Sequence, residues 1–196
     1  MPRSPRFKDL SLKDFAIFIS DFLRREGIET LLSGGACVAI YTKNKYMSYD
    51  LDFVLAAGDD NRRARKCLEA IGFAQKGRYL VPKDSKYFID FVSPPASVGE
   101  EPVKDVAEIR KGKRILRLLS ASDCVKDRLA AFYHWDDHQT LEQAVMVANA
   151  QPVDLKEIKR WSKAEGMLEK YGRFVSRLTH LERNEGSRKK RIKHEN

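Results

Sequence analysis

The chain has 196 residues, 42% of them hydrophobic, and its 37 basic and 28 acidic side chains give a net charge of +9. This length suits one domain, or a small catalytic domain with a helical appendage, that buries a hydrophobic core. No run approaches the roughly eighteen apolar residues that cross a bilayer, and the amino terminus lacks the apolar stretch of a signal peptide. We therefore expect a cytoplasmic protein without membrane contact, and the basic surplus favours polyanionic partners such as nucleotides or nucleic acid.

The first part of the chain mixes helical and strand patterns. Apolar side chains at helical spacing predict an amphipathic helix over residues 11–26, with Ser11 as its N-cap and Gly27 ending it. Further elements are expected at 28–32 (strand), 50–54 (strand), 61–71 (helix after Gly58 and Asp59), 73–81 (two short strands), 87–92 (strand closed by Pro94 and Pro95), and 103–109 with 114–118 (edge hairpin). Residues 36–42 have propensities that suit either a helix or a strand.

From Ser120 onward the pattern is wholly helical. Ser120 and Asp123 have the spacing of a capping box, which accounts for Asp123 without any catalytic role. Two aspartates then break this helix, and we expect Asp136 to cap the next one, which runs to Ala150. Further helices begin near Pro152 and continue past residue 166. Helices placed after a sheet are suited to forming one wall of a substrate cleft.

Three aspartates fall within apolar strand patterns. Asp50 and Asp52 are two residues apart in one strand, so both carboxylates project from the same face, with Cα atoms about 6.5 Å apart. Asp90 lies in the middle of a second apolar run, where an unpaired charge is costly to bury, so we expect a cation beside it. Carboxylates gathered on adjacent strands repel one another unless cations relieve the repulsion.

Divalent metal is the simplest source of that relief. Hard carboxylate oxygens suit Mg²⁺ or Mn²⁺, and a pair of such ions about 3.5–4 Å apart supports in-line phosphoryl displacement. The glycines of Ser33-Gly34-Gly35 follow the first strand, and residues without a Cβ allow a triphosphate to approach backbone N–H groups. A helix beginning at Ala36 would point its N-terminal dipole at the same phosphates.

In this order and spacing, Ser33-Gly34-Gly35, Asp50-Leu51-Asp52-Phe53 and Asp90 resemble the signature of the nucleotidyltransferase superfamily, which has the DNA polymerase β-like fold. The sequence from Ser48 to Phe53 is most similar to that of the abortive-infection AbiEii-type toxin branch and its small uncharacterised relatives. The resemblance covers residues 28–92, and it favours a helix over 36–42.

That resemblance implies roles for particular residues. Asp50 and Asp52 would bind the metals, and Asp90 would share a metal and help to deprotonate the acceptor hydroxyl. Ser33, Gly34, Gly35 and Ser48 would hold the nucleotide. In toxin-like relatives a basic residue on a helix such as the one after Ser120 also holds the nucleotide, and Lys126 lies in a comparable place, although a surface lysine is the alternative interpretation.

The expected architecture is an α/β (α+β) fold with a small mixed sheet of the nucleotidyltransferase type. Residues 1–118 form the catalytic domain, residues 119–182 a helical region packed on it, and residues 183–196 a flexible tail with six basic and two acidic side chains. The implied function is Mg²⁺-dependent transfer of a nucleoside monophosphate from ATP or another NTP to a hydroxyl acceptor. The net charge favours RNA, including a tRNA 3′ end, and the toxin resemblance adds an antitoxin as a partner.

Each feature also has a simpler interpretation. A glycine pair alone is usually a turn, an Asp-x-Asp alone is usually a solvated strand end, and a buried aspartate can satisfy an arginine or a backbone amide. The second hypothesis is therefore a catalytically inactive module of the same fold that binds RNA or a regulatory partner. All three carboxylates being present argues against that hypothesis.

Zinc and disulfide chemistry are disfavoured. Cys37, Cys67 and Cys124 are far apart with no C-x-x-C spacing, so they are expected as buried thiols. His134 and His138 have the spacing of a zincin helix, but the glutamate of H-E-x-x-H is missing.

Overall fold

The computed structural model describes residues 6–56, 60–92 and 96–194, with the backbone alone over 185–194. The helices are α1 (Leu12–Arg25), α2 (Gly34–Tyr41), α3 (Asn61–Ala70), α4 (Ala121–Trp135), α5 (His138–Ala150), α6 (Leu155–Ala164) and α7 (Leu168–His194). The strands are β1 (Thr30–Ser33), β2 (Asp50–Leu55), β3 (Phe73–Lys76), β4 (Tyr79–Pro82), β5 (Phe88–Val92), β6 (Ser97–Val98), β7 (Glu101–Pro102), β8 (Val106–Lys111) and β9 (Arg114–Leu119).

A mixed sheet forms the centre of the molecule. Its seven strands run in the order β3-β4-β5-β2-β1-β9-β8, so β2 is central, with β1 antiparallel on one side and β5 parallel on the other. β9 pairs with β1 in parallel and β8 lies at the edge, while β6 and β7 form a separate short hairpin that the sequence did not predict. The predicted α/β class with a helical C-terminal region is confirmed.

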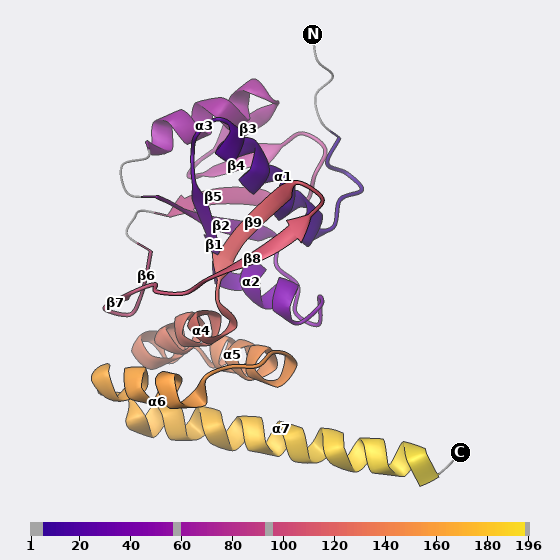
Figure 1. The fold of residues 1–196 in the computed structure, drawn as a ribbon, viewed down its shortest axis with the longest axis vertical. Helices are drawn as coiled ribbons and strands as arrows, with labels where there is room; N and C mark the ends of the chain where they lie inside the picture. The colour runs from indigo at the N-terminus through magenta and orange to yellow at the C-terminus, as the bar shows by residue number, and fades with distance from the viewer. Residues whose placement is uncertain (1–5, 57–59, 93–95, 195–196) are drawn as a thin grey trace.

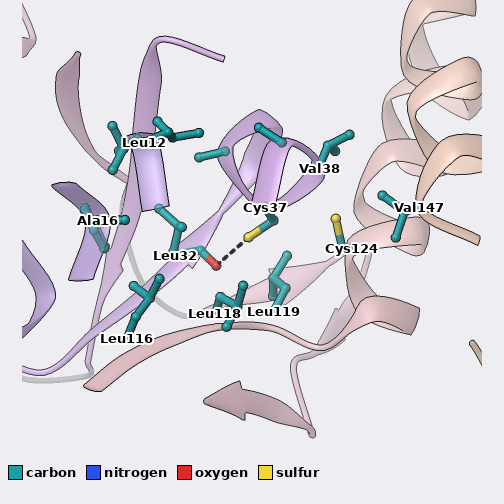
Figure 2. Close-up of a cluster of buried hydrophobic side chains, with 14 of the residues drawn as sticks. Leu12, Ala16, Leu32, Cys37, Val38, Leu116, Leu118, Leu119, Cys124 and Val147 are labelled. Carbon is teal, nitrogen blue, oxygen red and sulfur yellow. Dashed lines mark hydrogen bonds between the residues drawn. The ribbon is translucent and has the colours of Figure 1, made fainter. Parts of the chain in front are cut away.

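The two faces of the sheet differ in burial. Along β2 the side chains alternate, so Leu51 and Phe53 are fully buried on one face while Asp50 and Asp52 are half-buried on the other. The buried face packs against α1, and Figure 2 shows Leu12 and other side chains of α1 beside leucines from β1 and β9. The acidic side chains are therefore excluded from the hydrophobic core.

Helix α2 joins the sheet to the C-terminal helices. Figure 1 shows α4, α5, α6 and α7 stacked beyond the sheet, with α2 between the two parts. Tyr41 at the end of α2 donates its hydroxyl to the Leu119 carbonyl at 2.6 Å, and Gln151 donates its amide to the Tyr41 carbonyl at 2.8 Å. Cys37 and Cys124, from α2 and α4, are buried thiols as predicted (Figure 2), whereas Cys67 on α3 is only half-buried. The helical region is thus anchored to the same helix that begins at the glycine pair.

Local capping signals placed most helix ends correctly. Ser11 caps α1, and Ser120 caps α4 by accepting from the Asp123 N–H at 3.1 Å. The predicted cap of α5 was wrong by one residue, because Asp136 adopts a left-handed conformation (φ 52°) that ends α4. Asp137 is then extended and accepts from the N–H groups of the first turn of α5.

Several boundaries also depart from the predictions. Helix α2 begins at Gly34, two residues earlier than expected, and α7 continues to His194 through most of the segment 183–196. The expected turns at Gly58 and Asp59 and at Pro94 and Pro95 lie outside the described residues. Across the described helices, none has both the length and the apolar composition needed to span a bilayer.

The two tryptophans provide a matched test of the helical core. Trp161 is fully buried, its indole N–H donates to the Val98 carbonyl at 3.2 Å, and its ring stacks on Tyr133, whereas Trp135 is 77% exposed. We expect Trp161→Ala to lower the free energy of unfolding by about 3–5 kcal/mol because it leaves a large cavity. Trp135→Ala should change it by less than about 0.5 kcal/mol. Urea unfolding followed by circular dichroism would measure both, and equal effects would contradict the assigned burial.

Candidate active site

Pairing of β2 with β5 brings the predicted aspartates together. Asp52 lies directly opposite Asp90, and Asp50 lies opposite Phe88, in the parallel register of these strands. Neighbouring strands are about 4.8 Å apart, so the backbones of Asp52 and Asp90 are in immediate contact. Because residues that lie opposite in a parallel pair share a face, all three carboxylates project from the face that does not carry the core.

The Ser33-Gly34-Gly35 segment lies next to these aspartates. Ser33 ends β1 opposite Asp52, and its hydroxyl donates to the Asp52 carbonyl at 3.2 Å. Gly34 has φ of +70°, and a Cβ at this position would overlap the Asp52 carboxylate. A Cβ at Gly35 would lie 3.2 Å from the Ser48 hydroxyl. The backbone of α2 can therefore begin this close to Asp52 only because Gly34 lacks a side chain.

The first turn of α2 leaves backbone donors available. Ser33 is its N-cap residue, but the Ser33 side chain makes no capping hydrogen bond with the helix. The first N–H groups of a helix have no intrahelical partner and carry the positive end of the dipole. They lie beside Asp52, where an anionic ligand bridged to the carboxylates would meet them.

Ser48 has a local partner within the site. Its side chain is buried, and its hydroxyl donates to the Asp50 carboxylate at 2.5 Å, with the Asp50 carbonyl oxygen 3.2 Å away. This contact fixes the orientation of Asp50 at the start of β2. The structure thus gives Ser48 a positioning contact, and its role in holding the nucleotide stays a prediction.

Asp90 has the cationic neighbour that its burial required. The Arg78 Nε lies 3.0 Å from the Asp90 Oδ2, and the Arg78 side chain is 69% exposed while that of Asp90 is 10% exposed. Arg78 belongs to the turn between β3 and β4, so the pairing of β4 with β5 places it beside Asp90. No pattern in the sequence selects Arg78, because the contact depends on which strands are neighbours.

The electrostatics of the site act most strongly on Asp52. Burial of its carboxylate, followed by the negative charges of Asp50 and Asp90, raises the pKa of Asp52 to about 6 from its ordinary value near 4. Arg128 on α4 opposes this shift with its positive charge. Arg128 is itself held by the Asp127 carboxylate at 2.6 Å. The described site therefore has more negative charge than its own cations neutralise.

Lys126 lies elsewhere on α4. Its buried ammonium contacts the Glu157 carboxylate at 3.0 Å and the Asp123 carboxylate at 3.3 Å. It lines a cavity of about 380 Å³ between α4, α6 and the β6–β7 hairpin. Two residues along a helix point about 200° apart, so Lys126 faces away from the side of α4 that carries Arg128. The structure does not join Lys126 to the carboxylates, and its nucleotide contact stays a prediction.

The donor chemistry of the carboxylate face fits a divalent cation. Asp50 and Asp52 present hard oxygen ligands from one face. The pKa of Asp52 is raised first by burial and then by the negative charges of Asp50 and Asp90, and a bound cation would neutralise those charges. Among the described residues, no three histidine, cysteine or acidic side chains converge as a metal site. The Asp50 carboxylate accepts from Ser48, and the Asp90 carboxylate pairs with Arg78.

Comparison with known proteins gives a likeness of fold. No protein-family model and no curated sequence matches the chain. In structure the chain is similar to an antigenic nucleotidyltransferase-like protein from Paracoccidioides brasiliensis, with a TM-score of 0.59 and 12% identity over 89% of this chain and 95% of that one. The antibiotic-resistance factor ANT(2'')-Ia also aligns, at a TM-score of 0.43 and 15% identity over 88% of this chain and 95% of that one. The chain therefore has a nucleotidyltransferase-like fold, as the sequence motifs predicted.

Substitution of Gly34 tests the close approach of α2 to Asp52. We expect Gly34→Ala to lower the free energy of unfolding by about 2–4 kcal/mol, from left-handed strain together with overlap with the Asp52 carboxylate. The matched control is Gly77→Ala, where φ is +60° but nothing lies within 4 Å, so it should cost only about 1 kcal/mol. Chemical denaturation would give both values. Equal costs would show that the carboxylate does not constrain Gly34.

The raised pKa of Asp52 predicts a pH dependence without divalent metal. A folded-state pKa near 6 means that Asp52 contributes stability below about pH 4, which is lost as the pH rises through about 6. The free energy of unfolding of the native protein, minus that of Asp52→Asn, should therefore fall by about 2 kcal/mol between pH 4 and 7, after allowance for solvent screening. Urea titrations in a chelator would measure the difference. A flat profile would contradict the assigned electrostatics.

Proposed function

We propose that this protein is a nucleotidyltransferase that moves a nucleoside monophosphate from an NTP to a hydroxyl acceptor and releases pyrophosphate. The observation that carries the proposal is the meeting of three chain segments, β2, β5 and the start of α2, at one place. Asp52 lies opposite Asp90 on adjacent strands, and Gly34, which begins α2, packs against the Asp52 carboxylate. Carboxylates beside uncapped helix N–H groups suit a triphosphate bound with divalent cations. The nucleotidyltransferase-like fold supports the same interpretation.

Asp50 and Asp52 are the residues that would hold Mg²⁺ or Mn²⁺. When bound, such ions neutralise phosphate charge and stabilise the attacking and leaving oxygens of an in-line displacement. Ser48 keeps the Asp50 carboxylate in place through its hydrogen bond. Gly34 has no side chain between the N-terminus of α2 and the Asp52 carboxylate, so phosphate oxygens bound with these ions would meet the first N–H groups of the helix.

Asp90 is the residue that would accept a proton in the proposed reaction. In the proposed reaction an acceptor hydroxyl oxygen forms a bond to the α-phosphorus while the bond from that phosphorus to the bridging oxygen breaks, so that pyrophosphate leaves. The hydroxyl proton passes to the Asp90 carboxylate, which lies beside Asp52 in the register. We propose that Arg78, whose Nε contacts the Oδ2 of Asp90, moves away from the carboxylate when the acceptor binds.

The net charge of +9 favours RNA as the acceptor, including a tRNA 3′ end. A toxin-like role under the control of an antitoxin rests on the sequence between Ser48 and Phe53 alone. Growth arrest on expression that is lost in Asp50→Asn/Asp52→Asn would support this role, and unimpaired growth would reject it.

One observation favours a second candidate, an inactive module of the same fold that binds RNA or a regulatory partner. Arg78 occupies the Asp90 carboxylate, and an enduring pair of this kind would keep the third carboxylate from any reaction. The two candidates differ in one respect that can be measured. The active enzyme releases Asp90 when its substrates bind, whereas the module never does.

The first functional experiment is nucleotidyl transfer. Purified protein incubated with each α-labelled NTP, Mg²⁺ or Mn²⁺, and total RNA should transfer label to RNA, and Asp50→Asn/Asp52→Asn should reduce transfer by about 1,000-fold or more. Asp9→Asn is the matched control, because Asp9 is an exposed acidic residue of a turn before α1, outside the strands that carry the three carboxylates, and it should retain activity. Removal of divalent ions with a chelator should abolish transfer.

The outcomes separate the candidates. Label on protein or on a small molecule would retain the enzyme and reject RNA as the acceptor. RNA binding with no transfer under any condition would favour the inactive module.

A further inference from the structure

The side of the site opposite α2 carries an aromatic and cationic surface. Strands β3, β4 and β5 contribute it, and we call it the hairpin platform, made of Lys76, Arg78, Tyr79 and Phe88. The Tyr79 and Phe88 rings lie 4.9 Å apart at 68°, and the Arg78 guanidinium lies 4.9 Å from the centre of the Tyr79 ring. Lys76 pairs with Tyr79 across the hairpin and is exposed.

This platform adjoins the carboxylates directly. Phe88 lies opposite Asp50 in the register of β5 and β2, and Arg78 contacts the Asp90 carboxylate at 3.0 Å. The Tyr79 and Phe88 side chains are only half-buried, and a Cβ added to Gly77 in the turn would meet nothing within 4 Å. Aromatic and cationic groups are therefore open to a ligand next to the reacting centre.

The order of the strands separates this platform from the phosphate-binding side. Strand β1 and the start of α2 lie on one side of β2, and β5 with β4 lies on the other. In an in-line displacement the attacking oxygen and the leaving pyrophosphate are on opposite sides of the α-phosphorus. If the triphosphate meets α2, the acceptor hydroxyl must arrive from the side of β5. The hairpin platform lies on that path.

We propose that the hairpin platform binds the 3′-terminal nucleotides of a single-stranded RNA acceptor. The bases stack on Tyr79 and Phe88, and Lys76 and Arg78 contact the backbone phosphates. Stacking of a base on an aromatic ring strengthens binding by about 5- to 150-fold, and it requires bases that are not already paired in a duplex. The inference rests on the proposed function, and it assigns the acceptor class to particular residues of that site.

The contact between Arg78 and Asp90 would link acceptor binding on the hairpin platform to the availability of the Asp90 carboxylate. An acceptor phosphate competes with the Asp90 carboxylate for the same exposed guanidinium. When the phosphate takes Arg78, Asp90 is free to accept the hydroxyl proton. Arg78 is therefore a positioning residue that makes Asp90 available only when an acceptor is bound.

Direct binding tests the platform without requiring transfer. A 5′-fluorescein single-stranded RNA of about 12 nucleotides, followed by anisotropy in chelator without NTP, should bind the full-length protein. Tyr79→Ala should weaken binding by about 10-fold or more, while Tyr79→Phe, which keeps the ring, should bind like the native protein. Trp135→Ala is the matched control, since it removes an exposed aromatic ring from the end of α4, and it should have no effect.

The salt dependence of RNA binding tests the phosphate contact proposed for Arg78. Arg78→Ala should reduce the slope of log affinity against log salt by about 1, as expected for the loss of one phosphate contact. Arg173→Ala is the control, because Arg173 is also exposed and paired with a carboxylate, but on α7. Circular dichroism of each variant would confirm that it is folded.

The results distinguish failure of the platform from failure of the enzyme proposal. Native-like RNA binding by Tyr79→Ala and Arg78→Ala, or equal binding of a duplex with the same sequence, would overturn the platform even if label transfer occurs. The predicted loss of binding in both variants would support the platform even if no nucleotide is transferred.

Discussion

The parallel pairing of β2 with β5 is the interaction on which the site depends. It sets Asp52 opposite Asp90, and it also buries Phe53 and Ile89 on the reverse face of the same strands. A slip of one residue would exchange these faces and place the carboxylates in the core, at a large cost in free energy. Hydrophobic burial on one face therefore fixes the register that gathers negative charge on the other. Burial of the Asp52 carboxylate, followed by the negative charges of Asp50 and Asp90, raises the pKa of Asp52 to about 6.

Two arginines from different parts of the fold, Arg128 and Arg78, act on different carboxylates of the site. Arg128 lies on α4 and acts on Asp52 from the helical region, where Asp127 holds it. Arg78 is on an exposed turn and contacts Asp90 with most of its side chain in solvent. Only Arg78 is exposed in this pair, and Asp90 is buried, so displacement of Arg78 would leave a buried carboxylate without its cation. A divalent cation bound beside Asp52 would supply the replacement charge, so release of Asp90 depends on the ligands that fill the site.

Helix α2 couples the two parts of the molecule. It begins at Gly34 against the Asp52 carboxylate, and it ends at Tyr41 with hydrogen bonds to Leu119 and Gln151 in or beside the helical region. A displacement of the C-terminal helices would therefore move the glycine turn relative to the carboxylates. The chain connects sheet and helices through the element that would meet the phosphates.

The sequence by itself determined the features that depend on near neighbours in the chain. Alternation placed Asp50 and Asp52 on one face, capping residues marked most helix ends, and the order of motifs predicted a nucleotidyltransferase-like fold. Tertiary structure alone decided which strands are adjacent, and so which cation meets Asp90. It also separated Lys126 from the carboxylates by turning it toward Glu157. Contacts of this kind join residues distant in sequence, and no local propensity or period encodes which distant partner a side chain will meet.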